Sequence, residues 1–207
     1  MEKAIESRFL SHSRVEIRQA PGGKKLIRGY ALKYNTLSQI LYGEFKERID
    51  PGALEGCDLS DVFSTLNHDE NNLLGRTVSG TLKLRRDIVG LYYEIDPPKN
   101  GAGPHTLELV ERGDITGSSF VFELDTNGDR WDQEGGSLVR TLLKIKRIYE
   151  VGPVVSPAYL DTSVTVAQRT LEAWKRSLKS PPQDVIPEAV KQARQQLEHL
   201  KFKYNIR

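Results

Sequence analysis

The chain has 207 residues, a length that fits one ordinary domain with an appendage. Its composition, 38% hydrophobic and 28% charged residues, supplies enough apolar side chains for a buried core and argues against wholesale disorder, while a net charge of +2 is far below that of a dedicated nucleic-acid-binding protein. Cys57 is the only cysteine, which excludes an intrachain disulfide and a cysteine-based zinc site within one chain.

The sequence also predicts a soluble protein that is not exported. No stretch approaches the roughly 18 consecutive apolar residues that a membrane helix needs, and residues 1–6 lack the apolar core of a signal peptide. We therefore expect no membrane and no specific nucleic acid among its partners. A reducing compartment suits a chain with a single cysteine.

Short runs of strand-forming residues follow one another from residue 26 to about residue 165. Gly, Asn, Asp and Pro separate the runs, which is typical of strands joined by tight turns, and residues 86–90 and 125–129 are two such turn signals. We expect strands over residues 26–32, 80–84, 91–95, 119–124 and 138–155, the last either as one long strand or as two strands joined by a bend.

One short helix interrupts this strand-rich region. Over residues 104–113 a Pro opens the segment, apolar residues recur at helical spacing, and a Gly closes it. The strand patterns with this helix predict an α+β protein that is mainly β.

The pattern changes after Arg169. Residues 170–179 predict a helix, a Ser-Pro-Pro sequence breaks it, and residues 187–204 predict a longer, basic amphipathic helix. We interpret the longer helix as packed on the body or loosely attached to it, with a partner-binding tail as the alternative. The resulting division is an N-terminal extension over residues 1–25, a main domain over residues 26–169 and a helical C-terminal tail over residues 170–207.

Among the four histidines, His68 is the best placed to act as a general base. It follows an apolar strand candidate and precedes a polar loop, so a sheet would hold it while the loop admits a substrate. A structural histidine is the alternative. A metal site is the weaker enzyme interpretation, because a catalytic zinc usually needs three protein ligands and no paired-histidine spacing occurs.

Two serines, Ser118 and Ser119, follow a Gly-containing turn at the start of an aromatic strand candidate. A serine nucleophile needs a neighbouring base and backbone N–H donors for the oxyanion. Consecutive strand residues point to opposite faces, so at most one of the two can face a given site; taken alone, they are more simply ordinary hydroxyls at the start of a strand. The chain has no phosphate-binding glycine motif, and we expect no cofactor.

Seven short motifs occur in order along the chain, over residues 48–54, 66–69, 74–77, 79–82, 90–91, 112–122 and 150–159. Taken together, they resemble the prohead maturation proteases of tailed bacteriophages, and the resemblance covers roughly residues 26–169. It implies a serine endopeptidase that trims scaffold and capsid precursors inside the immature shell. It also implies a fold similar to the herpesvirus assembly protease (assemblin), a largely antiparallel β-barrel flanked by helices.

Carried onto the matching positions, the resemblance implies a catalytic triad. The family's Asn-His-Asp motif makes His68 the base, and its Gly-x-Ser-Phe motif makes Ser119 the nucleophile. Glu150, before the Val-x-Pro-Val segment, is the choice for the third member. The alternatives are Ser118 for the nucleophile and Asp69 or Asp114 for the acid.

The resemblance also bears on substrate binding and on partners. Arg76 either helps the oxyanion, binds a substrate carboxylate or forms an ordinary salt bridge, and the substrate is expected to add an extended strand by main-chain hydrogen bonds. The implied partners are the major capsid protein precursor and its scaffold segment. Self-cleavage, and a homodimer or higher oligomer, are left open. The implied location is the phage prohead in the cytoplasm of the bacterial host.

A second function, from another class, is a non-catalytic scaffold-binding or shell-assembly protein. The presence of both His68 and Ser119 favours the enzyme, because a purely structural descendant has no reason to retain them. A third interpretation, a nucleic-acid-binding module, rests on the basic residues after Arg169, but such an asymmetry is more typical of a solvated helix or a tethering tail.

Overall fold

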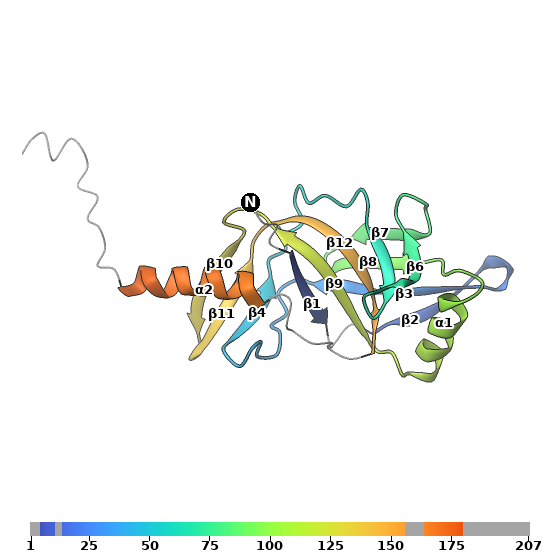
Figure 1. Ribbon diagram of the computed structural model, residues 1–207, viewed down its shortest axis with the longest axis horizontal. Helices are drawn as coiled ribbons and strands as arrows, with labels where there is room; N and C mark the ends of the chain where they lie inside the picture. The colour runs from blue at the N-terminus through green and yellow to red at the C-terminus, as the bar shows by residue number, and fades with distance from the viewer. Residues whose placement is uncertain (1–4, 11–13, 156–163, 180–207) are drawn as a thin grey trace, which may run out of the picture. The chain divides into compact units, whose positions relative to one another are not determined.

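The computed structural model describes residues 5–10, 14–155 and 164–179 (Figure 1). The chain divides into two compact units, Met1–Leu171 and Glu172–Arg207; the described part of the second is the end of one helix. The described elements, in chain order, are β1 (Ile5–Leu10), β2 (Glu16–Ala20), a 3₁₀ turn (Pro21–Gly23), β3 (Lys24–Lys33), β4 (Phe45–Ile49), β5 (Phe63–Leu66), β6 (Asp69–Arg76), β7 (Leu82–Arg86), β8 (Gly90–Ile95), α1 (Ala102–Arg112), β9 (Gly117–Leu124), β10 (Asp129–Glu134), β11 (Ser137–Leu142), β12 (Ile145–Val154) and α2 (Val164–Lys179).

The described strands form three sheets. Their strand orders are β1-β9-β12-β5-β6, β10-β11-β4 and β2-β3-β8-β7. Most neighbouring strands run antiparallel, whereas β11 with β4 and β12 with β5 are parallel. The prediction of a mainly β protein is confirmed.

None of these three sheets closes on itself within the described residues, because each strand order ends in two edge strands. The predicted barrel, and with it the likeness to the herpesvirus protease, is therefore not confirmed. Alternating side chains indicate where a strand lies and which face is buried, but closure depends on which distant strands pair. The pairing of β1 with β9 joins segments more than a hundred residues apart, and no local pattern in the sequence predicts it.

The sheets meet in one apolar core. In the four-stranded sheet, β3 contacts β9 of the five-stranded sheet, and apolar residues of both strands belong to the same buried cluster. Removing such side chains from water is the main source of stability in a fold of this kind. Members of the core that are at most 2% exposed include Ile27, Leu32, Leu91, Ile95, Phe120, Phe122, Ile148 and Val151.

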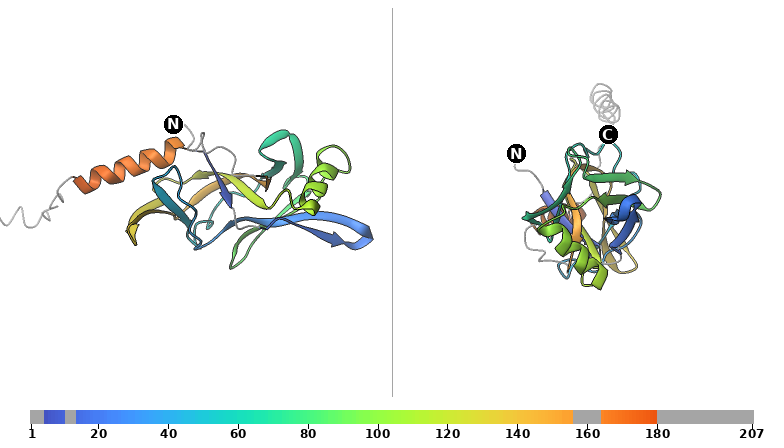
Figure 2. Two further views of the ribbon diagram at one scale, coloured as in Figure 1. Left: turned by 90° about the horizontal axis from the view of Figure 1, so that it is seen from below. Right: turned by 90° about the vertical axis from the view of Figure 1, so that its right-hand side faces the viewer.

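The single helix predicted inside the strand-rich region is α1. It packs against β2 and β6, and the left view of Figure 2 shows it, in green, beside the blue hairpin of β2 and β3. Gly113 ends the helix with φ of 82°, and its N–H donates to the Val110 carbonyl. This left-handed conformation suits a residue without a Cβ, which explains why the helix stops at a glycine.

The other predicted elements agree with the structure except at their bounds. The predicted strands over residues 26–32, 80–84, 91–95 and 119–124 correspond to β3, β7, β8 and β9, and residues 138–155 form two strands, β11 and β12. Residues 170–179 lie in α2, which begins earlier, at Val164. Residues 1–25, expected as an extension, contribute β1 and β2 to the sheets. The predicted helix over residues 187–204 lies outside the described residues.

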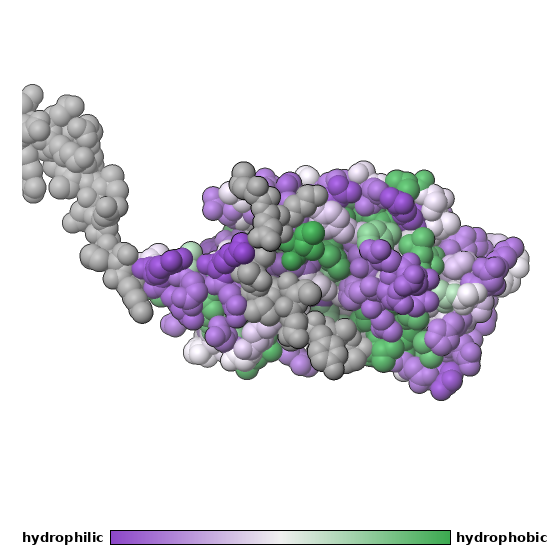
Figure 3. Space-filling model, in the orientation of Figure 1, coloured by the Kyte–Doolittle hydropathy of each residue, from purple (hydrophilic) through white to green (hydrophobic). Residues whose placement is uncertain are grey.

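The surface drawn in Figure 3 is mainly hydrophilic, with apolar residues in separate patches. In the described part of the chain, neither helix has the length and apolar composition to cross a membrane.

Candidate active site

Ser119 lies on β9, in the interior of the five-stranded sheet. Its partner on β1 is Phe9 and its partner on β12 is Gly152. The preceding residue, Ser118, points to the opposite face, where its hydroxyl lies 2.8 Å from the Tyr93 hydroxyl in the buried core. Burial raises the pKa of Tyr93 well above its usual range, so this phenol stays neutral. The strand alternation therefore separates the two serines, and only Ser119 faces the site.

His68 lies in the two-residue turn between β5 and β6. Asn67 and His68 have φ of 56° and 61°, the combination that a tight type I′ hairpin needs. The turn is tied to the end of β12: the Asn67 N–H donates to the Pro153 carbonyl at 3.1 Å, and the Val155 N–H donates to Asn67 Oδ1 at 2.9 Å. A left-handed histidine is uncommon, and these two bonds help to hold it there.

Glu150 lies on β12, the strand between β9 and β5. Its side chain is 8% exposed, and each carboxylate oxygen has a partner. Oε1 accepts a hydrogen bond from the Thr65 hydroxyl, and Oε2 lies 2.9 Å from His68 Nδ1. Thr65 and His68 together therefore fix the orientation of the carboxylate.

The imidazole of His68 bridges the acid and the hydroxyl. Nδ1 faces Glu150, and Nε2 lies 2.7 Å from Ser119 Oγ. When Nδ1 carries the proton and donates a hydrogen bond to the carboxylate, Nε2 is unprotonated and can accept the serine proton. The structure thus brings together the three residues that the sequence selected, in an arrangement that can activate a serine hydroxyl.

Gly152 explains how the turn comes close enough to the serine. It stands opposite Ser119, and a Cβ at this position would lie 2.4 Å from the Thr65 carbonyl oxygen of β5. Any larger residue would push β5, and the His68 turn that follows it, away from β12. Sequence reasoning missed the roles of Gly152 and Thr65; a glycine within a strand pattern is the available signal, since it often marks a close approach of two backbones.

The structure brings none of the other predicted candidates to His68. The Asp69 carboxylate accepts hydrogen bonds from the Asn71 backbone N–H at 2.9 Å and from the Asn72 amide at 2.7 Å. Asp114 forms an ion pair of 3.0 Å with Arg112. Arg76 forms a two-pronged pair with Asp61, each N–O distance being 2.7 Å, so it makes the salt bridge that was one of its three interpretations.

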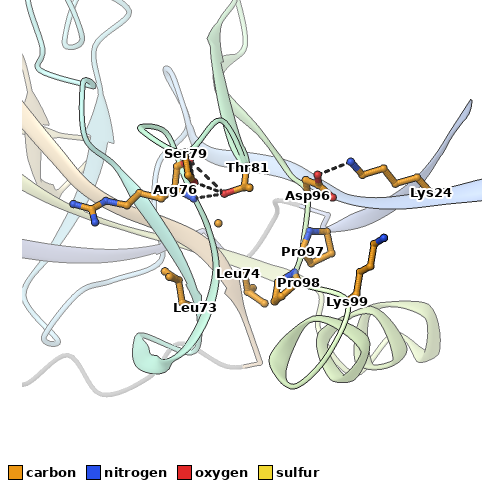
Figure 4. Close-up of a pocket in the computed structure, with 11 residues that line it drawn as sticks. Lys24, Leu73, Leu74, Arg76, Ser79, Thr81, Asp96, Pro97, Pro98 and Lys99 are labelled. Atoms are coloured by element: carbon orange, nitrogen blue, oxygen red, sulfur yellow. Dashed lines mark hydrogen bonds and ion pairs between the residues drawn. The ribbon is translucent and has the colours of Figure 1, made fainter.

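A pocket of about 340 Å³ lies apart from these three residues (Figure 4). It is lined by part of β6 and by the segment after β8, with Lys24 and Lys99 at its edge. Neither Ser119, His68 nor Glu150 lines it. Within the described ranges, no three His, Cys, Asp or Glu side chains are grouped to hold a metal ion.

Comparison with known proteins gives one match. A family model described as caudovirus prohead serine protease matches residues 13–177. This span contains the three site residues and begins after β1. No curated protein and no solved structure matches the chain.

Proposed function

The chain belongs to the caudovirus prohead serine protease family, and on this premise we propose that it cleaves the capsid and scaffold precursors of a tailed phage. Family membership makes it a serine endopeptidase of capsid maturation that acts inside the prohead during assembly. The proposal adds the major capsid precursor and its scaffold segment as substrates and the cytoplasm of the bacterial host as the place of assembly. A barrel like that of the herpesvirus protease is part of the same proposal.

In this proposal Ser119 is the nucleophile, His68 the base and Glu150 the orienting acid. The single observation that carries it is the imidazole that contacts Glu150 through Nδ1 and Ser119 through Nε2. Nε2 takes the hydroxyl proton as Oγ attacks the scissile carbonyl carbon, and the carboxylate stabilises the imidazolium that forms. The imidazolium then gives its proton to the leaving amine, and water hydrolyses the acyl-enzyme by the same steps.

The alternative, a non-catalytic scaffold-binding protein, has less support. A protein that only binds scaffold has no need for a left-handed histidine held between a carboxylate and a serine. Backbone conformations of this kind persist where the surrounding structure holds them, and they are concentrated at functional sites.

Co-expression with the major capsid precursor tests the proposed function. The wild-type chain is expected to shorten the precursor, with the new termini read by mass spectrometry, and Ser119→Ala is expected to leave the precursor intact. The mass of the protease itself, measured in the same samples, tests self-cleavage. A precursor of unchanged mass beside the wild-type chain, or equal products with Ser119→Ala, would contradict the proposal.

Glu150→Gln is expected to lower turnover less than loss of the nucleophile or base, by about 10⁴-fold against about 10⁶-fold. The amide keeps the shape of the carboxylate, but it carries no charge to stabilise the imidazolium and does not select the tautomer that Nε2 needs. Turnover of a precursor-derived peptide measures the effect, and thermal unfolding checks that the fold survives.

The matched control is Glu134→Gln, which changes a carboxylate paired with Arg48 on the separate sheet of β10. We expect its turnover to equal that of the wild type. If Glu150→Gln has wild-type turnover, Glu150 is not the acid that orients His68, and another acid must have that role.

A further inference from the structure

The edge strand β1 covers Ser119. It lies beside β9 (Figure 1) and pairs with that strand along its whole length, with Phe9 directly opposite Ser119. The ring of Phe9 lies over Gly117, where a Cβ would be 2.2 Å from the ring. Ser119 is 3% exposed, whereas the His68 side chain is 26% exposed. The base is therefore open to solvent while the serine beside it is closed.

The backbone of β1 also competes for the serine proton. Ser119 Oγ lies 2.9 Å from the Arg8 carbonyl oxygen, which accepts its hydrogen bond, and 2.7 Å from His68 Nε2. A hydroxyl has a single proton. When it donates to Arg8, it cannot donate to His68, which is the direction that attack on a carbonyl requires.

Two charged side chains hold β1 in place from its other face. Arg8 donates to both carboxylate oxygens of Glu47 on β4, at 2.6 and 2.9 Å. Glu6 accepts from two nitrogens of Arg140 on β11, at 2.7 and 2.9 Å. All four residues are at most 5% exposed. Two-pronged pairs of this kind are strong and specific in geometry.

Simple release of β1 would leave this cluster incomplete. Glu47 would lose both hydrogen bonds from Arg8, and Arg140 would lose both of its hydrogen bonds to Glu6. Arg140 would still contact Glu47 at 3.0 Å and Asp129 at 2.7 Å, but buried charged groups that lose hydrogen bonds are destabilised. A second extended peptide could restore both pairs if it carried an acid two residues before an arginine. The cluster therefore favours exchange of β1 for a peptide of matching charge over opening of an empty edge.

We propose that the β9 edge, with Glu47 and Arg140 beneath it, is the binding site for the substrate strand, and that β1 occupies it in the resting protein. The ligand is an extended peptide with an acid two residues before an arginine. This inference rests on the proposed function, because it assigns the substrate strand to that same site. The family match starts at residue 13, after β1, which agrees with β1 being an accessory to the protease domain.

A reversible crosslink in the full chain tests the exchange. Ser7 and Val121 are register partners on β1 and β9, and paired strand positions have a spacing that a disulfide can join. Burial raises the pKa of the native Cys57 thiol to about 11, so this thiol competes little for the engineered bond. A fluorophosphonate probe, which reacts with activated serines, reports on Ser119.

Oxidation of the Ser7→Cys/Val121→Cys chain is expected to slow probe labelling about tenfold or more, and reduction is expected to restore it. The control disulfide joins Gln19→Cys and Lys25→Cys, register partners on β2 and β3, and should leave labelling unchanged on oxidation. Equal labelling of the locked and reduced chains would overturn the exchange.

Peptide binding provides a readout that needs no catalysis. The probe is a fluorescent peptide with the sequence of Ile5–Leu10, Ile-Glu-Ser-Arg-Phe-Leu, added to the same double-cysteine chain carrying Ser119→Ala. Anisotropy should show binding to the reduced chain only, because the disulfide of the oxidised chain keeps β1 on the β9 edge. The same peptide with alanine in place of its arginine should bind with an affinity at least about tenfold lower. Equal binding of the two peptides would overturn the charge requirement.

Phe9→Ala gives a second variant that needs no crosslink. It removes the ring over Gly117 and so loosens β1, and labelling of Ser119 is expected to rise about threefold or more. Unchanged or slower labelling in a folded Phe9→Ala chain would count against the exchange.

The two proposals can fail separately. If the reduced chain binds the peptide and the wild type cuts no precursor, the protease function is wrong while the strand-binding site is supported. If the locked chain cuts precursor at the full rate, the strand site fails while the protease function stands.

Discussion

Ser119→Ala and His68→Ala are each expected to abolish cleavage of the capsid precursor, lowering turnover by about 10⁶-fold. The two side chains work as a unit, since the proton that leaves Ser119 Oγ must pass to His68 Nε2, 2.7 Å away. The double variant should therefore be no slower than either single variant. The measurement is the rate of product formation from purified precursor, with thermal unfolding as the check on folding.

Ser118→Ala is the matched control for this result. It removes a hydroxyl from the neighbouring residue, but that hydroxyl bonds Tyr93 in the core and not His68. We expect cleavage at close to the wild-type rate and a loss of about 1 kcal/mol in unfolding free energy. If Ser118→Ala is inactive and Ser119→Ala is active, Ser118 and not Ser119 is the nucleophile. If both variants cleave at the normal rate, neither serine of β9 is the nucleophile.

Arg140→Ala is expected to cost about 3–5 kcal/mol of unfolding free energy, the largest effect on stability that we predict. Arg140 is 0% exposed and pairs with three carboxylates, on Glu6, Glu47 and Asp129. Its removal leaves these three carboxylates buried with too little positive charge. Among the described residues, Arg8 is then the basic partner of Glu6 and Glu47. Urea unfolding measures the loss.

The control for Arg140→Ala is Arg130→Ala, also in the three-stranded sheet. Arg130 pairs with Asp132 at 2.8 Å, and both side chains are exposed. An exposed pair of this type contributes about 0–1 kcal/mol. A loss in Arg140→Ala no larger than in Arg130→Ala would contradict the importance of the buried cluster.

The pH dependence of the Arg140→Ala loss gives a further check. Burial acts to raise the pKa of Glu6, but the hydrogen bond from Arg140 and the charges of Arg8 and Arg140 outweigh it and bring the pKa below its usual value of 4.5. In the wild type, Glu6 therefore stabilises the fold above that value, and this contribution is lost as the pH falls through the lowered pKa. Without Arg140 the pKa of Glu6 rises, so its ionised form disfavours folding at neutral pH. The difference in unfolding free energy between the wild type and Arg140→Ala should therefore narrow as the pH falls towards 4.5. A difference that widens as the pH falls would contradict this account.

Local patterns in the sequence predicted the short helix and the strands β3, β7, β8, β9, β11 and β12, whereas the site residues were selected by the family resemblance. The alternation of residues 119–124 predicts a strand whose consecutive side chains point to opposite faces, which means that Ser118 and Ser119 cannot share a site. His68 lies between a strand candidate and a polar loop, and motif resemblance selects His68, Ser119 and Glu150. Such features depend on neighbours within a few residues, which is the range over which backbone preference and side-chain periodicity act.

The resemblance favoured Glu150 as the acid and left Asp69 and Asp114 open, and the tertiary structure places Glu150 against His68. Asp69 adjoins His68 in sequence and Asp114 lies close to Ser119, yet only Glu150 contacts the imidazole, because β12 lies between β9 and β5. The parallel pairing of β12 with β5 and the docking of β1 on β9 also came only from the structure. These pairings join segments far apart in the chain, and their choice depends on how the buried faces and charges of all the strands fit together, which no single stretch of sequence contains.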